Sequence, residues 1–182
     1  MLLKPLRINF EVMKSSRLVL GFMLMAMLCA CHKSHNRQVP VKENHIAGNI
    51  DVFESNNKDV KKLLKEAESW LGVPYKYGGN DRDGVDCSGM VVQVFLRSWD
   101  LKLPRTCLTI SEYCQVLEKK DIKAGDLVFF ATGKDPEKIS HVGILLDNDR
   151  FIHSSTSKGV VVSNLSSPYY QRTFRLFGRI NR

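Results

Sequence analysis

The apolar residues of this chain change their spacing once, near residue 120. Before that point they recur at helical intervals, first from Val60 to Leu71 and then from Met90 to Phe95. A third helical pattern runs from residue 109 to about residue 118. The later part holds five short β-rich runs separated by turns: 126–130, 141–146, 150–153, 160–162 and 174–177. Helices followed by strands predict an α+β domain in which N-terminal helices pack on an antiparallel sheet of about five strands.

The N-terminus has the pattern of an export signal. Lys14 and Arg17 precede the apolar run Leu18–Leu28, which as a helix would be about 16 Å long and too short for a hydrocarbon core of about 30 Å. The run ends in Leu28-Cys29-Ala30-Cys31, which resembles the bacterial lipoprotein signal. We therefore expect residues 1–31 to be a signal peptide with a lipobox and Cys31 to be acylated, with an ordinary secreted signal as the alternative. Met13 is the more usual start for such a signal, so residues 1–12 are an upstream extension or a misassigned start.

Residues 32–57 are polar and lack periodicity, which predicts a flexible tether before a single folded domain at 58–182. The histidines of the tether, His32, His35 and His45, are followed by nothing with metal-ligand spacing. The sequence contains no H-E-x-x-H motif, and we expect neither a metal nor a cofactor.

The composition limits the partners. The chain is 43% hydrophobic, enough for a packed core, and its formal net charge is +8. The lysines are scattered and no nucleic-acid motif is present, so we expect no nucleic-acid binding. An acidic polymer such as the cell wall is compatible with the charge, as is an ordinary solvated surface.

Cys87 lies where a polar turn bounded by Gly84 and Gly89 meets an apolar helical run. In the first turn of a helix, unpaired backbone N–H groups and the positive end of the helix dipole favour a thiolate. The pattern therefore predicts a nucleophile, and a buried structural cysteine is the alternative.

Two histidines lie on neighbouring predicted strands. The turn at 147–149 predicts a hairpin that brings His141 and His153 across from one another or nearly so. Thiol catalysis needs a histidine beside the cysteine and a polar residue behind that histidine. We expect His141 to be the general base and acid, and His153 to orient it.

Six segments match, in order, the motifs of the NlpC/P60 family of cell-wall cysteine peptidases, and the chain most resembles its Spr-type lipoprotein murein endopeptidases. The segments are Gly72–Gly79, Gly84–Gly89, Leu103–Arg105, Gly125–Phe130, His141–Ile144 and Phe151–Ser155. The resemblance covers about residues 59–181 and implies a papain-like fold. It implies catalytic roles for Cys87, His141 and His153 and an oxyanion-stabilising role for Tyr75, and it points to substrate binding by Asp86 and Ser88.

The resemblance implies hydrolysis of peptide bonds in peptidoglycan stem peptides or cross-links. The Spr-type match favours a D,D-endopeptidase that cuts between D-alanine and diaminopimelate. The alternatives are a D,L-endopeptidase that cuts between D-glutamate and diaminopimelate, an amidase or acyltransferase, and a non-catalytic wall-binding lipoprotein. We expect a monomer held by its lipid anchor on the periplasmic face of the outer membrane of a Gram-negative bacterium.

The family motifs assign no role to two cysteines and two tyrosines. Cys107 and Cys114 would be about 10 Å apart on one helix, too far for a disulfide, so we expect buried free thiols. If Cys107 lies in the loop instead, a disulfide with Cys114 stays possible. We expect Tyr169 and Tyr170 in the core, with the wall of the substrate groove as the alternative.

Overall fold

The computed structural model describes residues 57–181. The predicted signal peptide, the acylation at Cys31 and the tether up to residue 56 lie outside the described residues.

The first described helix begins at a side chain that caps it. Helix α1 (Lys58–Glu68) starts at Asn57, whose side chain accepts a hydrogen bond from the Asp59 N–H at 2.9 Å. Three more α-helices and one 3₁₀-helix follow: α2 (Cys87–Trp99), α3 (Cys107–Tyr113), η1 (Lys119–Asp121) and α4 (Pro168–Thr173). Within residues 57–181 no helix has the length and apolar content needed to span a bilayer.

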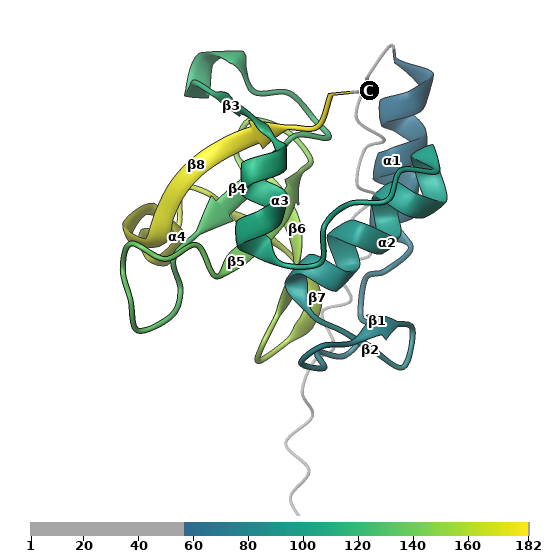
Figure 1. The fold of residues 1–182 in the computed structure, drawn as a ribbon, viewed down its shortest axis with the longest axis horizontal. Helices are drawn as coiled ribbons and strands as arrows, with labels where there is room; N and C mark the ends of the chain where they lie inside the picture. The colour runs from purple at the N-terminus through teal and green to yellow at the C-terminus, as the bar shows by residue number, and fades with distance from the viewer. Residues whose placement is uncertain (1–56, 182) are drawn as a thin grey trace, which may run out of the picture. The chain divides into compact units, whose positions relative to one another are not determined.

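The strands form one six-stranded antiparallel sheet and a small two-stranded ribbon (Figure 1). The order in the large sheet is β3-β8-β4-β5-β6-β7. Its strands are β3 (Gln115–Leu117), β4 (Leu127–Phe130), β5 (His141–Leu145), β6 (Arg150–Ser155), β7 (Gly159–Asn164) and β8 (Phe174–Arg179). The ribbon pairs β1 (Asn80–Asp81) with β2 (Gly84–Val85) just before α2. All five predicted strands are present, and the predicted α+β class is confirmed.

The third predicted helix is too long at its C-terminal end. Helix α3 stops at Tyr113, and the next residues form edge strand β3 instead of a further helical turn. Val116 pairs with Gly178 of β8, and a side chain at Gly178 would overlap Cys114. Pairing with β8 therefore decides the conformation of this segment, which its own helical spacing did not reveal.

The sheet buries apolar residues on both faces. Because successive side chains of a strand point to opposite faces, Phe129 and Phe130 enter different cores. One core joins the sheet to α1 and α2, which lie side by side in Figure 1; the other contains Phe130, Leu145, Phe151 and Phe177. The helical and sheet parts of the domain therefore meet across the first core.

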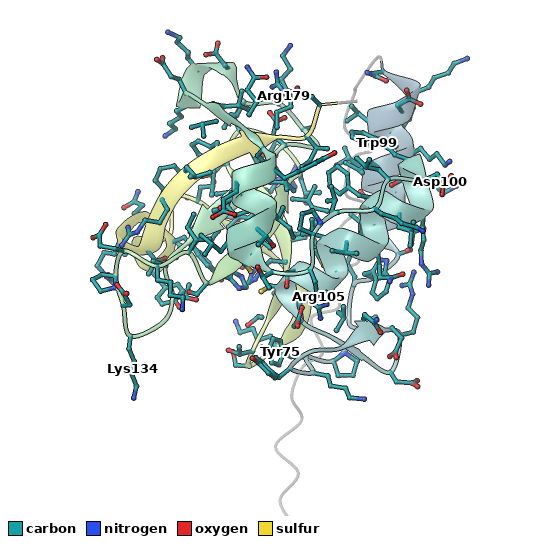
Figure 2. The ribbon with its side chains drawn as sticks, viewed as in Figure 1. Tyr75, Trp99, Asp100, Arg105, Lys134 and Arg179 are labelled. Atoms are coloured by element: carbon teal, nitrogen blue, oxygen red, sulfur yellow. The ribbon has the colours of Figure 1, made fainter. Side chains whose placement is uncertain are left out.

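A buried ion pair joins the start of β4 to the end of β8. Asp126 is almost fully buried, and its carboxylate accepts hydrogen bonds from Arg179 Nε at 2.7 Å and Nη2 at 2.8 Å (Arg179 is labelled in Figure 2). The backbone N–H of Lys123 donates to the same carboxylate at 2.6 Å. Arg179 therefore provides the positive charge that makes burial of Asp126 tolerable.

Replacing Arg179 should leave that carboxylate buried without its partner. Fully buried pairs lose about 3 to 5 kcal/mol when one member is removed. Because the Arg179 side chain is 32% exposed, we expect Arg179→Met to lower the free energy of unfolding by about 2 kcal/mol. Urea denaturation measures this, with Arg172→Met on the exposed side of α4 as the control. Equal stability of the two variants would contradict the assignment.

Candidate active site

Asp86 caps helix α2 and fixes the turn that carries Cys87. Its Oδ1 accepts the Gly89 N–H at 2.6 Å, and its backbone carbonyl accepts the Met90 N–H at 3.0 Å. A side chain at Gly89 would overlap the carbonyl oxygen of Gly79 and crowd Asp86. Glycine is therefore required here by close packing, and Cys87 becomes the first residue of a rigid helix.

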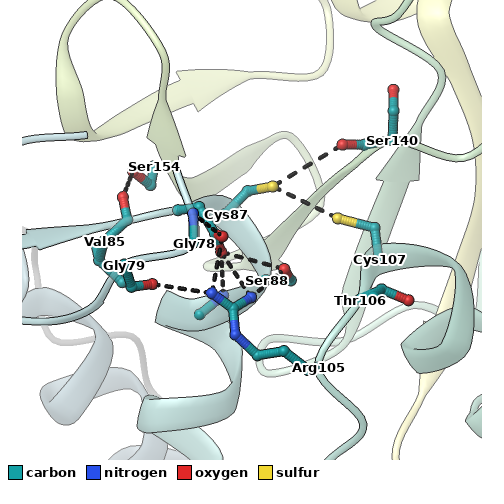
Figure 3. Close-up of polar contacts among 12 residues, drawn as sticks. Gly78, Gly79, Val85, Cys87, Ser88, Arg105, Thr106, Cys107, Ser140 and Ser154 are labelled. Carbon is teal, nitrogen blue, oxygen red and sulfur yellow. Dashed lines mark hydrogen bonds and ion pairs between the residues drawn. The ribbon is translucent and has the colours of Figure 1, made fainter. Parts of the chain in front are cut away.

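Arg105, labelled in Figure 3, also binds the Asp86 carboxylate. Its Nη1 and Nη2 donate to Asp86 Oδ1 at 2.9 Å and Oδ2 at 2.8 Å, and it also reaches Ser88 Oγ at 2.8 Å. Burial alone would raise the pKa of Asp86, but the hydrogen bonds from Arg105 and Gly89 outweigh burial and lower the pKa. The carboxylate therefore stays ionised.

This arrangement bears on the predicted substrate contacts. Asp86 and Ser88 are both buried and are hydrogen-bonded to one another and to Arg105. Both nevertheless line the cavity beside Cys87. Their role in substrate binding stays a prediction. Arg105 was not among the predicted site residues, although it ends the Leu103–Arg105 motif. Its side chain is 41% exposed and lines the same cavity.

The Cys87 thiol is buried and faces a second thiol (Figure 3). Its Sγ lies 3.5 Å from Cys107 Sγ and 3.9 Å from the carbonyl oxygen of Ser140. The hydrogen bond from Cys107 lowers the pKa of Cys87, burial opposes this, and the hydrogen bond and charge of His141 lower the pKa further, to about 5. Cys87 is therefore a thiolate at neutral pH, which is the state of a nucleophile.

His141 and His153 meet as the hairpin predicted. Ile144 pairs with Ile152 between β5 and β6, which places the two histidines diagonally on one face of the sheet. His141 Nε2 lies 2.8 Å from His153 Nδ1, with the ring planes at 85°. Because Nε2 is occupied, the nitrogen of His141 that remains for Cys87 is Nδ1.

His153 is a neutral acceptor for His141. Burial lowers the pKa of His153, and the charges of His141 and Lys158 lower it further, to about 3. Its Nε2 lies 3.0 Å from Ser163 Oγ and 3.1 Å from the Tyr170 hydroxyl. A proton on Nε2 is donated to these oxygens and leaves the Nδ1 lone pair facing the Nε2–H of His141. The surroundings of His153 thus select the tautomer that stabilises a charged His141.

Ser163 was not among the predicted site residues, and Tyr169 and Tyr170 were expected in the core, with the groove wall as the alternative; both line the cavity that contains the histidines. Tyr170 does pack against Phe151, but its hydroxyl reaches the site, and Tyr169 is exposed. Ser163 pairs with Phe151 of β6, so the register of β6 and β7 puts it on the face of His153. A register prediction for this hairpin could have found it.

Tyr75 is held at the site by backbone pairing around it. Val85 N–H donates to the carbonyl of Pro74 at 3.0 Å, and Lys76 N–H donates to the carbonyl of Val85 at 3.3 Å. Burial, followed by the charge of Cys87, raises the pKa of Tyr75, so its hydroxyl keeps its proton at neutral pH, which the predicted oxyanion-stabilising role would require. Tyr75 and Arg105 lie at the same end of the domain in Figure 2 and line the cavity that holds Cys87.

Two cavities lie at the predicted catalytic residues, and the adjacent residues Ser140 and His141 line one each. The first, of about 740 Å³, contains Cys87 together with the cationic side chains Arg105 and Lys138. The second, of about 630 Å³, contains both histidines and is rich in hydroxyl groups: Thr132, Ser155, Thr156, Ser157, Ser163, Ser166, Ser167, Tyr169 and Tyr170. Between residues 57 and 181 no three His, Cys, Asp or Glu side chains are grouped to hold a metal ion.

The sequence model of the NlpC/P60 family matches residues 72–179, a span that contains every predicted catalytic residue. A Haemophilus influenzae protein named probable endopeptidase is 42% identical over 65% of this chain and 73% of its own. The probable endopeptidase NlpC of Escherichia coli is 38% identical over 86% of this chain and 94% of its own. The murein DD-endopeptidase MepS/murein LD-carboxypeptidase of Escherichia coli is 33% identical, with 79% and 77% covered.

Solved structures have the same fold. A lipoprotein-like protein of the NLP/P60 family from Staphylococcus aureus superposes with a TM-score of 0.64 at 30% identity. The match covers 71% of this chain and 43% of that longer chain.

The acidity of Cys87 can be measured directly. We expect its alkylation by iodoacetamide to rise with pH around a midpoint of about 5, followed by mass spectrometry of tryptic peptide 83–97. Cys107→Ala removes the first hydrogen-bond donor and should raise the midpoint, whereas Cys107→Ser retains a donor and should change it less. A wild-type midpoint of about 8.5, that of an ordinary thiol, would contradict the geometry.

The tautomer of His153 is the second test. We expect ¹⁵N NMR of histidine-labelled protein to show the proton of His153 on Nε2 at neutral pH. Removing both oxygens in Ser163→Ala/Tyr170→Phe should shift the proton towards Nδ1, since Nε2 then loses both of its hydroxyl acceptors. The single variants should retain the original tautomer. A wild-type proton on Nδ1 would refute this arrangement.

Proposed function

This chain belongs to the NlpC/P60 family, and from that premise we propose that it is a cysteine peptidase that hydrolyses peptide bonds in peptidoglycan. The observation that carries the proposal is an acidic thiol beside a pair of hydrogen-bonded histidines, between two open cavities. The names of the bacterial relatives support peptidoglycan as the substrate, since one of them is a murein endopeptidase.

The first chemical step is attack by Cys87. Its thiolate adds to the amide carbonyl carbon, and the carbonyl oxygen becomes an oxyanion. The Cys87 N–H, which as a first-turn group lacks an intrahelical acceptor, and the Tyr75 hydroxyl stabilise that charge. Losing one such donor typically reduces turnover on the order of 10²-fold.

The second step needs a proton at the leaving amine. His141 donates it from Nδ1 as the carbon–nitrogen bond breaks, and a thioester to Cys87 remains. Water, deprotonated by the same nitrogen, then attacks the thioester and releases the carboxylate product and the thiolate. His153 stabilises the charged form of His141 in both steps by accepting its Nε2–H.

The two cavities suggest how the substrate lies. We place the acyl part of the substrate in the Cys87 cavity, because that cavity contains the nucleophile, and Asp86 and Ser88 are its neighbours there. Lys138 in this cavity and Lys158 in the other are cations that can face the carboxylates of a stem peptide. The hydroxyl-rich cavity beside His141 then receives the amine part, which leaves with the proton from that residue.

For the bond, we propose a D,D-endopeptidase that cuts the cross-link between D-alanine and diaminopimelate. The relative named DD-endopeptidase supports this choice, and its resemblance extends over most of both chains. D,L cleavage after D-glutamate is the second candidate, because the same constellation cuts either amide. The remaining alternatives would give different products. Transfer of the acyl group to an amine and amidase activity would each yield products other than those of cross-link hydrolysis, and a wall-binding role without catalysis would yield none.

We also propose the location that the N-terminal sequence suggests. Acylation at Cys31 would anchor a monomer through its tether on the periplasmic face of the outer membrane, within reach of the wall.

Mass spectrometry of muropeptides tests the reaction. Purified cross-linked dimers and free stems are incubated with protein lacking residues 1–31, and Cys87→Ala serves as the control. We expect dimers to become monomers only with the intact thiol, because no covalent intermediate forms without it. Stems cut after D-glutamate would establish the D,L activity instead, and equal products from both proteins would overturn the cysteine mechanism.

A further inference from the structure

We propose that Cys87 and Cys107 are a redox-active thiol pair, in which Cys107 resolves oxidised Cys87 into a reversible intramolecular disulfide. The proposal adds regulation to the same site, and its effect on activity rests on the proposed peptidase function. The formation of the disulfide itself does not.

The two sulfurs are already in contact. Cys87 Sγ and Cys107 Sγ are 3.5 Å apart, and Figure 3 shows them facing one another from different segments. A disulfide bond is about 2.05 Å long, so an approach of roughly 1.5 Å is needed. Each cysteine is the first residue of its helix, α2 or α3, and the loop 100–106 between these helices is free of regular secondary structure. We place the required movement in this loop.

The pair is shielded but reachable. Cys87 is 8% exposed and Cys107 is 7% exposed, and both line the cavity of about 740 Å³. Hydrogen peroxide is small enough to reach both sulfurs through that cavity. We therefore name a small peroxide as the oxidant.

The reaction balances with peroxide alone. The Cys87 thiolate attacks one peroxide oxygen, the O–O bond breaks, and after protonation of the leaving hydroxide the products are a sulfenic acid and water. Cys107 Sγ then attacks Cys87 Sγ, the S–O bond breaks, and the hydroxyl leaves with the Cys107 proton as a second water. Two thiols have given two electrons to one peroxide and form one disulfide.

The two cysteines have different acidities, as this sequence of steps requires. The interaction with Cys87, followed by burial, raises the pKa of Cys107, so it stays a thiol while Cys87 is the thiolate that reacts first. Cys114 follows α3 at its other end, and burial raises the pKa of its thiol to about 12. Cys114 is therefore the matched cysteine that should not take part.

The consequence is protection of the nucleophile. A sulfenic acid without a nearby thiol is oxidised further to a sulfinic acid, which ordinary thiols do not reduce. With Cys107 at 3.5 Å, the disulfide forms instead, and a thiol reductant restores both cysteines. The enzyme is switched off without being destroyed.

The test is peptide mapping of the full chain, purified in detergent and treated with a few equivalents of hydrogen peroxide. Cys87 lies in tryptic peptide 83–97, and Cys107 shares peptide 106–119 with Cys114. Mapping in a Cys114→Ser background therefore makes the linkage unambiguous. We expect the two peptides to be joined with loss of two hydrogens in this variant, and Cys87 to become sulfinic acid in Cys107→Ser.

Activity on muropeptides is the second readout. After peroxide, reductant should restore the Cys114→Ser enzyme to at least nine-tenths of its starting rate, whereas Cys107→Ser should remain inactive. Formation of sulfinic acid at equal rates in both variants, or no oxidation of Cys87 at all, would overturn the proposal. If the protein cuts no muropeptide, the proposed function fails, but the peptide map still decides whether the thiol pair forms a disulfide.

Discussion

The carboxylate of Asp86 is the interaction on which the rest of the site depends. It caps the helix that carries the nucleophile, binds the Gly78 N–H at 2.9 Å, and receives the fork of Arg105. The backbone before the ribbon, the start of α2 and the segment before α3 are thereby tied to one buried charge. Because Cys107 follows Arg105 by two residues, the same ion pair also sets where the second thiol lies. Asp86 thus positions both thiols, although its own negative charge raises the pKa of Cys87 and opposes the effects of Cys107 and His141.

The sheet supplies the other half of the site through aromatic packing. The ring of His153 lies 4.9 Å from that of Phe151 and 5.6 Å from that of Tyr170, and Phe130 lies 6.1 Å from His141. These contacts desolvate both histidines and fix their planes before any substrate arrives. In serine proteases a carboxylate orients the catalytic histidine, and that carboxylate carries no proton. A neutral His153 carries one proton, which must lie on Nε2 so that Nδ1 can accept the hydrogen bond from His141. Ser163 and Tyr170 provide that direction.

The sequence predicted those features that local patterns control. The helical spacing from Val60 to Leu71, the strand runs and the hairpin at 147–149 were sufficient for the fold class and for the meeting of the two histidines. Local patterns did not predict the features that depend on contacts between segments distant in the sequence. Residues 115–117 form strand β3 because they pair with β8. The contact between Cys87 and Cys107 depends on how two helices joined by an irregular loop are placed. Spacing within one segment carries no information about either.

The groups that acidify Cys87 have a consequence for the chain before it folds. Both of them, Cys107 and His141, come later in the sequence, and each acts only once its element has reached α2. In an unfolded or newly made chain the thiol therefore has the ordinary pKa of about 8.5 and is mostly protonated at neutral pH. The docking of α3 and of the sheet against α2 therefore generates most of the thiolate, so an unfinished molecule carries little reactive thiolate that could attack its neighbours.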